Sequence, residues 1–245
     1  MKSTRLDQYL YDNGLCRSRS LGAKLIREGF VFVDGRECGK PALKVSEENR
    51  VEVRDNSLSR YVSRGGLKLE AALEEFGVEL RGKLCIDIGS STGGFTDCLL
   101  QHGARRVYAI DSGSGQLHES LRENPCVVSM ENTNARFLDE SMVPVSPIVV
   151  MDVSFISQSL LYPAVSKVLA EDGFFISLIK PQFEVGRENI GSGGIVRNEK
   201  ARLECIDKLR AEGAKHGLVM QKCIPSSILG GDGNQEYLAL FHKEN

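Results

Sequence analysis

Tryptophan is absent from this sequence, and its seven cysteines include no C-x-x-C pair. An odd number of scattered thiols is a poor basis for a disulfide framework or for a zinc site. The four histidines show no H-x-x-x-H spacing, which is the helical spacing of many metal sites. We therefore expect no disulfide framework and no metal.

A long hydrophobic run is also missing. The longest apolar stretches, 147–151 and 173–179, fall well short of the roughly 18 residues that a membrane-spanning helix needs. No apolar core follows the first basic residues, so we expect no signal peptide. With 41% hydrophobic and 26% charged residues, the composition is that of a globular protein. We expect a cytoplasmic protein without a membrane partner.

Charge is distributed unevenly along the 245 residues. Residues 1–68 hold 14 Lys and Arg against 9 Asp and Glu, whereas residues 69–245 hold 17 against 24. A basic module attracts polyanions, and phosphate backbones are the commonest target. A solvated charged face would give the same composition, so charge alone favours neither interpretation.

The first 55 residues predict two helices followed by a small sheet. Helices are expected at 5–13 and 18–28, strands at 30–33, 43–45 and 50–53, and a hairpin turn at 34–35. This pattern resembles the small RNA-binding module first found in a ribosomal protein of the small subunit, the S4-like module. In that module the second helix docks on structured RNA. The resemblance implies phosphate contacts by Arg17, Arg19, Lys24 and Arg27, which lie on or beside that helix.

The remaining sequence alternates strands and helices. Residues 59–66 are polar and lack periodicity, so we expect domains at 1–58 and 67–245 joined by this linker. A helix is expected from residue 67 to Gly77. Strands are expected at 84–88, 106–110, 126–130, 147–151, 173–179, 218–223 and 237–241, with helices near 94–102, 114–122, 155–170 and 197–216. Apolar strands between helices predict an α/β, Rossmann-like sheet of seven strands, and the short final connection predicts an antiparallel last strand.

A glycine-rich turn follows the first strand of this sheet. The segment 89–94 reads G-S-S-T-G-G, and Asp111 ends the next strand, where an acid can accept both hydroxyls of a ribose. These features predict an adenosine-containing cofactor. Ser91 replaces the second glycine that a dinucleotide would require, and the G-K-[ST] of a P-loop is absent. The string DIGSSTGGF instead resembles motif I of S-adenosylmethionine-dependent methyltransferases.

The residues after the fourth strand limit the acceptor chemistry. Exocyclic-amine methyltransferases typically carry an N/D-P-P-Y/F turn there, whereas this chain has M-D-V-S-F at 151–155. Cys126 stands at the start of the third strand, away from the carboxyl ends, and is expected to be a core residue rather than a nucleophile. Asp152 and Lys180 end strands, where a charge is costly unless it is paired. Together with Lys68 and Glu236, they would satisfy one another in a single cleft.

Lys68, Asp152, Lys180 and Glu236 resemble the K-D-K-E tetrad of the FtsJ-like RNA 2′-O-methyltransferases. The surrounding strings SRGGLKL, MDVSFIS, IKPQFE and NQEYL match that family closely. With the N-terminal module, the whole chain resembles the TlyA family of rRNA (cytidine-2′-O)-methyltransferases, which are often labelled hemolysins. The resemblance implies S-adenosylmethionine as the cofactor and ribosomal RNA or a ribosomal subunit as the partner.

The resemblance also implies a role for each residue of the tetrad. Lys180 would remove or steer the proton of the ribose 2′-hydroxyl, Asp152 would orient Lys180, and Glu236 would hold Lys68 or the ribose. The implied cofactor contacts are Gly89, Gly93, Gly94, Phe95, Asp111, Asn132 and Asp152. The glycine-rich segment 185–198 is expected to close over the substrate.

Two other functions stay open at this stage. A non-catalytic ribosome-assembly factor could keep the same fold, although an intact tetrad argues against it. A membrane-active hemolysin is disfavoured, because the sequence offers no spanning segment and no basic amphipathic helix.

Overall fold

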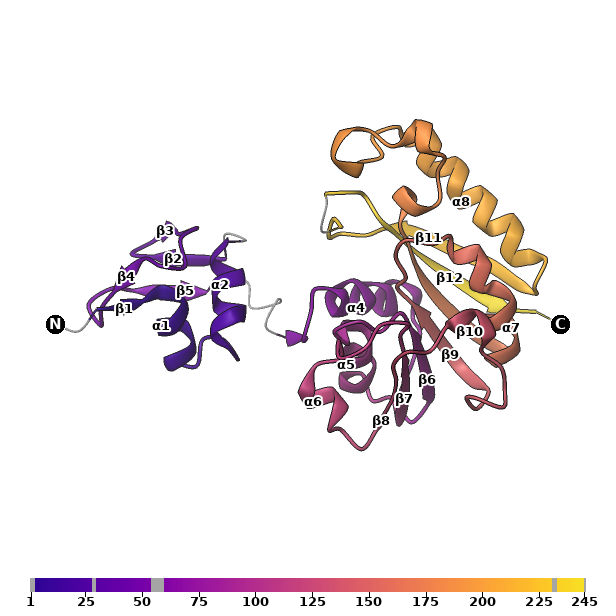
Figure 1. The fold of residues 1–245 in the computed structure, drawn as a ribbon, viewed down its shortest axis with the longest axis horizontal. Helices are drawn as coiled ribbons and strands as arrows, with labels where there is room; N and C mark the ends of the chain where they lie inside the picture. The colour runs from indigo at the N-terminus through magenta and orange to yellow at the C-terminus, as the bar shows by residue number, and fades with distance from the viewer. Residues whose placement is uncertain (1–2, 28–29, 54–59, 231–232, 245) are drawn as a thin grey trace. The chain divides into compact units, whose positions relative to one another are not determined.

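The computed structural model describes residues 3–27, 30–53, 60–230 and 233–244. The chain divides into two compact units, Met1–Tyr61 and Val62–Asn245 (Figure 1). This division falls inside the predicted linker 59–66. The described residues do not include residue 58, where the predicted first domain ends, or residue 59, where the predicted linker begins. They also leave out residue 28, the predicted end of the second helix. The domain boundaries therefore stay a prediction.

In its described residues, the N-terminal unit has two helices and two small sheets. Its elements are β1 (Thr4–Arg5), α1 (Leu6–Asp12), α2 (Arg19–Arg27), β2 (Val31–Val33), β3 (Arg36–Glu37), β4 (Lys44–Val45) and β5 (Val51–Val53). The larger sheet has the order β3-β2-β5, and β1 pairs with β4. Asp34 and Gly35 both have positive φ, as a two-residue hairpin turn requires. Leu6, Leu10 and Leu25, on the two helices, are completely buried and belong to the core of this unit.

The second unit is built on the expected seven-stranded sheet. Its strands are β6 (Leu84–Ile88), β7 (Arg106–Ile110), β8 (Val127–Met130), β9 (Ser146–Met151), β10 (Leu169–Ile179), β11 (Leu218–Pro225) and β12 (Tyr237–Lys243). The spatial order is β11-β12-β10-β9-β6-β7-β8. Strands β6 to β10 pair in parallel, whereas β12 is antiparallel to both of its neighbours. The predicted fold class and the antiparallel last strand are confirmed.

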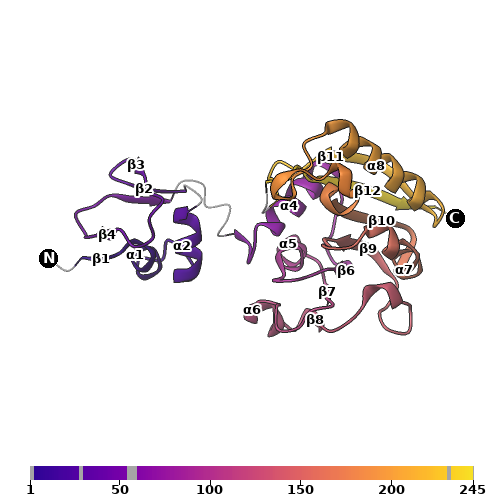
Figure 2. The ribbon, with the colours of Figure 1, turned by 45° about the horizontal axis from the view of Figure 1, so that its top comes forward.

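Helices cover both faces of this sheet. The helices are α4 (Gly65–Phe76), α5 (Gly94–Gln101), α6 (Glu119–Arg122), α7 (Tyr162–Val168) and α8 (Glu199–Ala214). Helices α4 and α5 lie on one face, and α7 and α8 lie on the other (Figures 1 and 2). On the second face, the rings of Tyr162, Phe175 and Phe241 pack with centroid separations of 5.1–6.0 Å. This cluster anchors α7 beneath β10 and β12.

Two predicted helices are shorter than expected. The helix near 114–122 is reduced to α6, because the Glu131 carboxylate accepts the backbone N–H groups of Gln116 and Leu117. The helix near 155–170 is reduced to the 3₁₀ helix η2 (Gln158–Leu161) followed by α7. Residues 153–157 form an irregular loop in which Phe155 has positive φ. Tertiary contacts thus override the local preference for helix in both places.

Candidate active site

The register of four strands brings the predicted tetrad together at one edge of the sheet. Ile88 of β6 pairs with Met151 of β9, so Gly89 and Asp152 follow neighbouring strand ends. Ile179 of β10 pairs with Tyr237 of β12. Because β12 runs antiparallel, Glu236 precedes that strand beside Lys180, which follows β10. Charges that lie far apart in the sequence therefore meet at the carboxyl edge of the parallel strands, where ligands of such sheets bind.

The four side chains form two ion pairs. Lys68 Nζ on α4 lies 2.5 Å from Glu236 Oε2, and both residues are buried. Lys180 Nζ lies 2.5 Å from Asp152 Oδ1 and donates a 2.9 Å hydrogen bond to Ser154 Oγ. The second pair is less buried than the first, with side chains 14% and 25% exposed. The Lys180–Asp152 pair is therefore the more accessible of the two to a substrate.

Two cavities meet beside the Lys180–Asp152 pair. One, of about 410 Å³, is lined by Gly89, Asp111, Asp152, Ser154, Phe155 and others. The other, of about 360 Å³, is lined by residues that include Ser154, Phe155, Lys180, Phe183, Ile190 and Glu236. Ser154 and Phe155 belong to both. The site thus offers two adjoining compartments, each of a size that suits a small ligand or part of one.

The first cavity contains some of the predicted cofactor contacts. Gly89 has a φ of 82°, and a Cβ at this position would overlap the carbonyl oxygen of Asp152. The Asp111 carboxylate accepts the backbone N–H groups of Ser91 and Gly113, both at 2.8 Å. These bonds fix the carboxylate toward the cavity. Gly89, Asp111 and Asp152 therefore wall the space that the sequence assigns to the cofactor.

The other predicted cofactor contacts lie away from this cavity. Gly93 is the N-cap of α5, Gly94 is its first residue, and Phe95 is buried within that helix. Asn132 is exposed and has a φ of 54°, while the next residues, Thr133 and Asn134, line the cavity. The turn at 89–94 thus contributes through Gly89 and Ser91, and the cofactor roles of the four outlying residues stay predictions.

A buried carboxyl stands behind the glycine turn. Asp87 on β6 is completely buried and accepts a 2.6 Å hydrogen bond from Thr96 Oγ1 through Oδ2. Among the described residues its Oδ1 has no hydrogen-bond partner. Burial raises the pKa of Asp87 to about 7, and the charges of Asp152 and Asp111 act in the same direction. Asp87 does not line the cavity itself, but a positive charge nearby would favour its ionised form.

An exposed aromatic pair borders the second cavity. Phe155 is 89% exposed and has a φ of 67°, which is strained backbone for a bulky residue. Its ring lies 5.2 Å from that of Phe183, tilted by 51°. An aromatic side chain left in water on a strained loop provides a flat apolar surface, which is what a planar ring stacks on.

Comparison with known proteins agrees with this geometry. Residues 61–243 match the family model for the FtsJ-like methyltransferases, and residues 4–51 match that for the S4 domain. The chain belongs to the FtsJ-like methyltransferase family. Its resemblance to TlyA proteins, inferred from the tetrad strings, is confirmed by the relatives.

Two relatives and one solved structure cover most of this FtsJ-like chain. Hemolysin A of Brachyspira hyodysenteriae is 42% identical over 239 residues, which are 97% of this chain and 99% of that protein. The 16S/23S rRNA (cytidine-2′-O)-methyltransferase TlyA of Mycobacterium tuberculosis is 40% identical over 237 residues, which are 96% of this chain and 88% of that protein. A solved Streptococcus thermophilus structure, named for hemolysins, is 39% identical, with a TM-score of 0.78 over 100% of this chain and 90% of its own.

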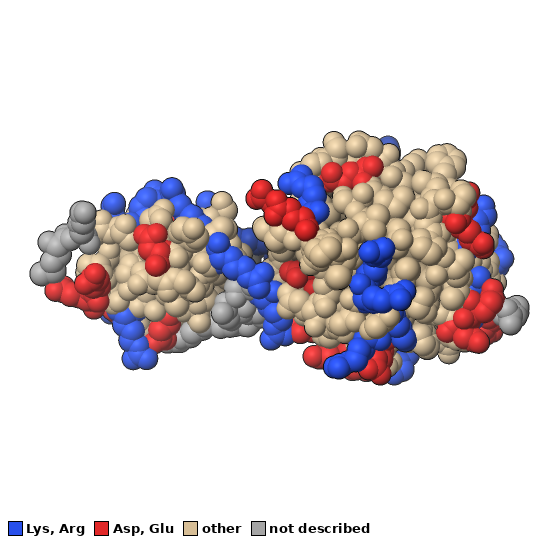
Figure 3. Space-filling view, turned by 90° about the horizontal axis from the view of Figure 1, so that it is seen from below, with Lys and Arg blue, Asp and Glu red and all other residues tan. Residues whose placement is uncertain are grey.

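The predicted RNA contacts lie on or beside α2 of the S4 unit. Lys24 and Arg27 occupy its last turn. Arg17 Nη2 donates a 3.2 Å hydrogen bond to the Arg60 carbonyl, and Arg19 Nε binds the Asp7 carboxylate at 3.2 Å. Figure 3 shows basic and acidic side chains together on one face of this unit. The unit therefore has more basic than acidic residues, but its surface is not uniformly basic. Two of the four predicted RNA contacts, Arg17 and Arg19, already form hydrogen bonds within the protein.

Sequence reasoning missed the residue that connects the two loops of the FtsJ-like site. Glu184 follows the 3₁₀ helix η3 (Pro181–Phe183), and its carboxylate accepts Ser157 Oγ at 2.7 Å and Gln158 N–H at 2.9 Å. Burial raises the pKa of Glu184. It thereby ties the loop after β10, which carries Lys180, to the loop after β9, which carries Phe155. In the sequence, Glu184 was marked only by the family string IKPQFE, which assigned it no role.

The predicted cover segment 185–198 reaches the second cavity through Ile190 and Gly194. Asn234, which is fully buried, donates to the Gly194 carbonyl and accepts the Val196 N–H. The segment is thus hydrogen-bonded to the loop before β12, and its closure over a substrate stays a prediction. Among the described helices, none combines the length and hydrophobicity that crossing a bilayer requires.

Proposed function

We propose that this chain transfers a methyl group from S-adenosylmethionine to the ribose 2′-oxygen of a cytidine in ribosomal RNA. One observation carries the proposal. Lys180 lines the second cavity, while its partners Asp152 and Ser154 line the first. A nucleotide in the second cavity would therefore have its hydroxyl beside Lys180, at the junction with the donor compartment.

The first cavity supports the proposed cofactor. Gly89 gives the main chain close approach, Asp111 offers carboxylate oxygens to ribose hydroxyls, and Asp152 adds negative charge. S-adenosylmethionine, when bound, supplies a methyl group on a positively charged sulfur. Asp87 behind the turn fits such a cation, because a nearby positive charge favours the ionised carboxylate.

The chemistry that the chain itself would supply is mostly alignment. Asp152 and Ser154 hold the Nζ of Lys180, which is positioned to orient the 2′-hydroxyl and, as the neutral amine, to take up its proton. Lys68 and Glu236 neutralise each other, and Glu236 also walls the second cavity. Correct placement of reacting groups supplies a large share of the acceleration in such sites, and a positioned proton acceptor contributes roughly 10²–10⁴-fold more.

Two features support RNA as the substrate. The S4 unit carries the basic residues that phosphates attract. At the catalytic unit, Phe155 and Phe183 form a stacking surface for an unpaired base, and such stacking contributes about 1–3 kcal/mol per base. The name of the Mycobacterium tuberculosis relative supports cytidine as the nucleotide and ribosomal RNA as its source.

The test is direct detection of the product. Ribosomal subunits from cells that lack the gene are incubated with the purified protein and methyl-labelled cofactor, and the digested RNA is examined by mass spectrometry. We expect 2′-O-methylcytidine. Lys180→Ala should lower the rate by about 100-fold or more while rRNA binding persists. Lys200→Ala, at an exposed lysine on α8, should leave the rate unchanged.

Other outcomes would favour other functions. A methyl group on a base, or full activity in Lys180→Ala, contradicts the proposed chemistry. A non-catalytic assembly factor would bind RNA without taking up the cofactor in a calorimetric titration. The name of the Brachyspira hyodysenteriae relative raises membrane activity as a second candidate. Leakage of liposomes caused by the purified protein would support that candidate instead.

A further inference from the structure

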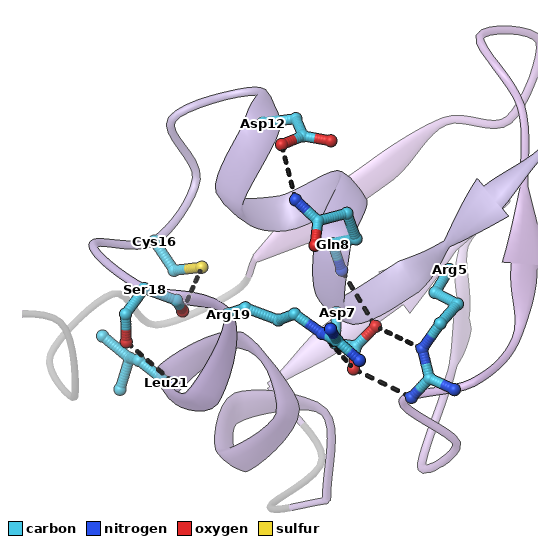
Figure 4. A network of polar contacts seen from close by, with 8 residues as sticks. All are labelled: Arg5, Asp7, Gln8, Asp12, Cys16, Ser18, Arg19 and Leu21. Atoms are coloured by element: carbon cyan, nitrogen blue, oxygen red, sulfur yellow. Dashed lines mark hydrogen bonds and ion pairs between the residues drawn. The ribbon is translucent and has the colours of Figure 1, made fainter.

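Asp7 lies at the centre of a small charged network in the S4 unit (Figure 4). It stands in the first turn of α1, and its side chain is only 4% exposed. Arg5 donates to both carboxylate oxygens, at 3.0 and 2.9 Å, and Arg19 Nε donates to Oδ2 at 3.2 Å. The Gln8 N–H adds a fourth hydrogen bond at 2.9 Å. A single buried carboxylate therefore holds two guanidinium groups.

Close packing of α1 and α2 makes this bridge possible. A Cβ on Gly22 would lie 3.0 Å from the Asp7 carbonyl oxygen and 3.1 Å from Cys16 Sγ. The glycine therefore lets α2, which carries Arg19, approach α1. Hydrogen bonding from Arg5, supported by Arg19, lowers the pKa of Asp7 to about 2. The carboxylate is thus ionised at physiological pH.

Asp7 holds both arginines in place without using all of their hydrogen-bond donors. Their side chains remain 41% and 54% exposed. Arg5 uses two of its five guanidinium N–H groups on Asp7, and Arg19 uses one. Among the described residues, none accepts a hydrogen bond from the remaining guanidinium N–H groups of these two arginines. Two guanidinium groups that flank one oxygen would repel each other without the carboxylate between them, and together they still present a net positive charge with unused donors.

We propose that Asp7 is a positioning residue, which holds Arg5 and Arg19 as one binding site for a phosphodiester group of RNA. The proposal rests on the proposed function for the identity of the RNA. Arginine binds phosphate oxygens through pairs of N–H groups in a fixed fork. A fork already held in place loses less conformational freedom on binding, which strengthens the complex.

The sign of the effect separates this role from simple charge. Removing a negative charge from a basic RNA-binding unit should strengthen binding if only net charge matters. Removing Asp7 should instead weaken binding, because the two arginines lose their fixed geometry. Asp12 provides a matched control, since it is an exposed acid on the same helix.

The experiment compares Asp7→Asn with Asp12→Asn in the full-length chain. Binding to purified ribosomal RNA is titrated at several salt concentrations, and KM for RNA is measured in the methylation assay. We expect Asp7→Asn to bind about tenfold more weakly, with a shallower salt dependence and a raised KM for RNA. Asp12→Asn should bind as tightly as wild type or slightly more tightly. In an Arg5→Gln, Arg19→Gln background, Asp7→Asn should cause no further loss.

Each result decides the question. Equal affinities of Asp7→Asn and Asp12→Asn overturn the inference and leave the proposed function intact. A wild-type chain that neither binds nor methylates ribosomal RNA overturns the proposed function, and this inference with it. If circular dichroism shows that Asp7→Asn unfolds the S4 unit, the charge-conserving pair Arg5→Lys, Arg19→Lys decides instead. Weaker binding by that variant supports the phosphate site, and unchanged binding overturns it.

Discussion

Replacing Glu236 by alanine should destabilise the catalytic unit far more than a surface substitution would. The change removes the partner of Lys68 and leaves an ammonium group in a position where the residue is only 8% exposed. The two residues are 168 positions apart, so their contact joins α4 to the start of β12. Losing it affects the fold as well as the site.

The size of the loss follows from burial. Removing one partner of a buried ion pair costs about 3–5 kcal/mol, because the remaining charge is left without compensation. For a unit of this size, 1 kcal/mol corresponds to about 2–4 °C in the unfolding midpoint. Glu236→Ala should therefore unfold about 6–20 °C below wild type. Glu204→Ala breaks the exposed Lys200–Glu204 pair and should change the midpoint by less than about 2 °C.

Differential scanning calorimetry measures the effect, with attention to the transition of the larger unit. The double variant Lys68→Met, Glu236→Met removes both charges and should recover most of the lost stability, because apolar replacements of a buried pair are often neutral. A midpoint for Glu236→Ala within about 2 °C of wild type would show that an unpaired Lys68 costs the unit little stability. So would a double variant that is less stable than the single one.

Three further substitutions test other parts of the molecule. Phe155→Gly should raise the unfolding midpoint slightly, by relieving about 1 kcal/mol of left-handed backbone strain, yet raise KM for RNA about 5- to 150-fold through lost stacking. Gly89→Ala should abolish cofactor binding in calorimetry, because its Cβ would overlap the Asp152 carbonyl. Asp7 has a pKa of about 2, below its usual 3.8. Its bridge should therefore stabilise the S4 unit above about pH 4 and weaken as pH falls toward 2. The contribution is about 2 kcal/mol at most, reduced to roughly 1 kcal/mol because both arginines are substantially exposed. Urea unfolding at several pH values should show it vanish in Asp7→Asn.

Clear outcomes would contradict these three predictions. Unchanged KM in Phe155→Gly would remove the aromatic pair from RNA binding, with Phe137→Gly, at another exposed aromatic, as the control. Normal cofactor affinity in Gly89→Ala would mean that the first cavity is not the donor site. A pH dependence of stability between 4 and 2 that is identical in wild type and Asp7→Asn would show that Asp7 gains nothing from its arginines on folding.

Continuous patterns in the chain were sufficient to predict most of the sheet. Strands β6 and β7 lie at the predicted bounds, because an apolar run covered on both faces is marked by composition alone. Helix lengths were less predictable. Residues 114–118 and 155–157 have sequences that allow helix. In the first segment, the Glu131 carboxylate accepts a backbone N–H group, and in the second, the Glu184 carboxylate accepts the Ser157 hydroxyl. Both carboxylates lie outside the segments that they bind.

For the site, the sequence pointed to the charged residues but not to their arrangement. Asp152 and Lys180 could be placed at one edge because parallel strands end together. That Glu236 holds Lys68 was one of two possibilities, and the register of β12 against β10 selected it. The exposure of Phe155 and the bridge through Asp7 had no local signal, since each depends on what a distant segment leaves uncovered or brings close.

Local sequence was enough to place most strands and helices and the residue types at their ends, because apolar periodicity, glycine turns and terminal charges are properties of neighbouring residues. The packing of distant segments selected which charges pair, which cavities adjoin and which aromatic ring remains in water. Those outcomes depend on strand register and on contacts such as the one that closes over 168 residues between Lys68 and Glu236, and no local pattern encodes such distances.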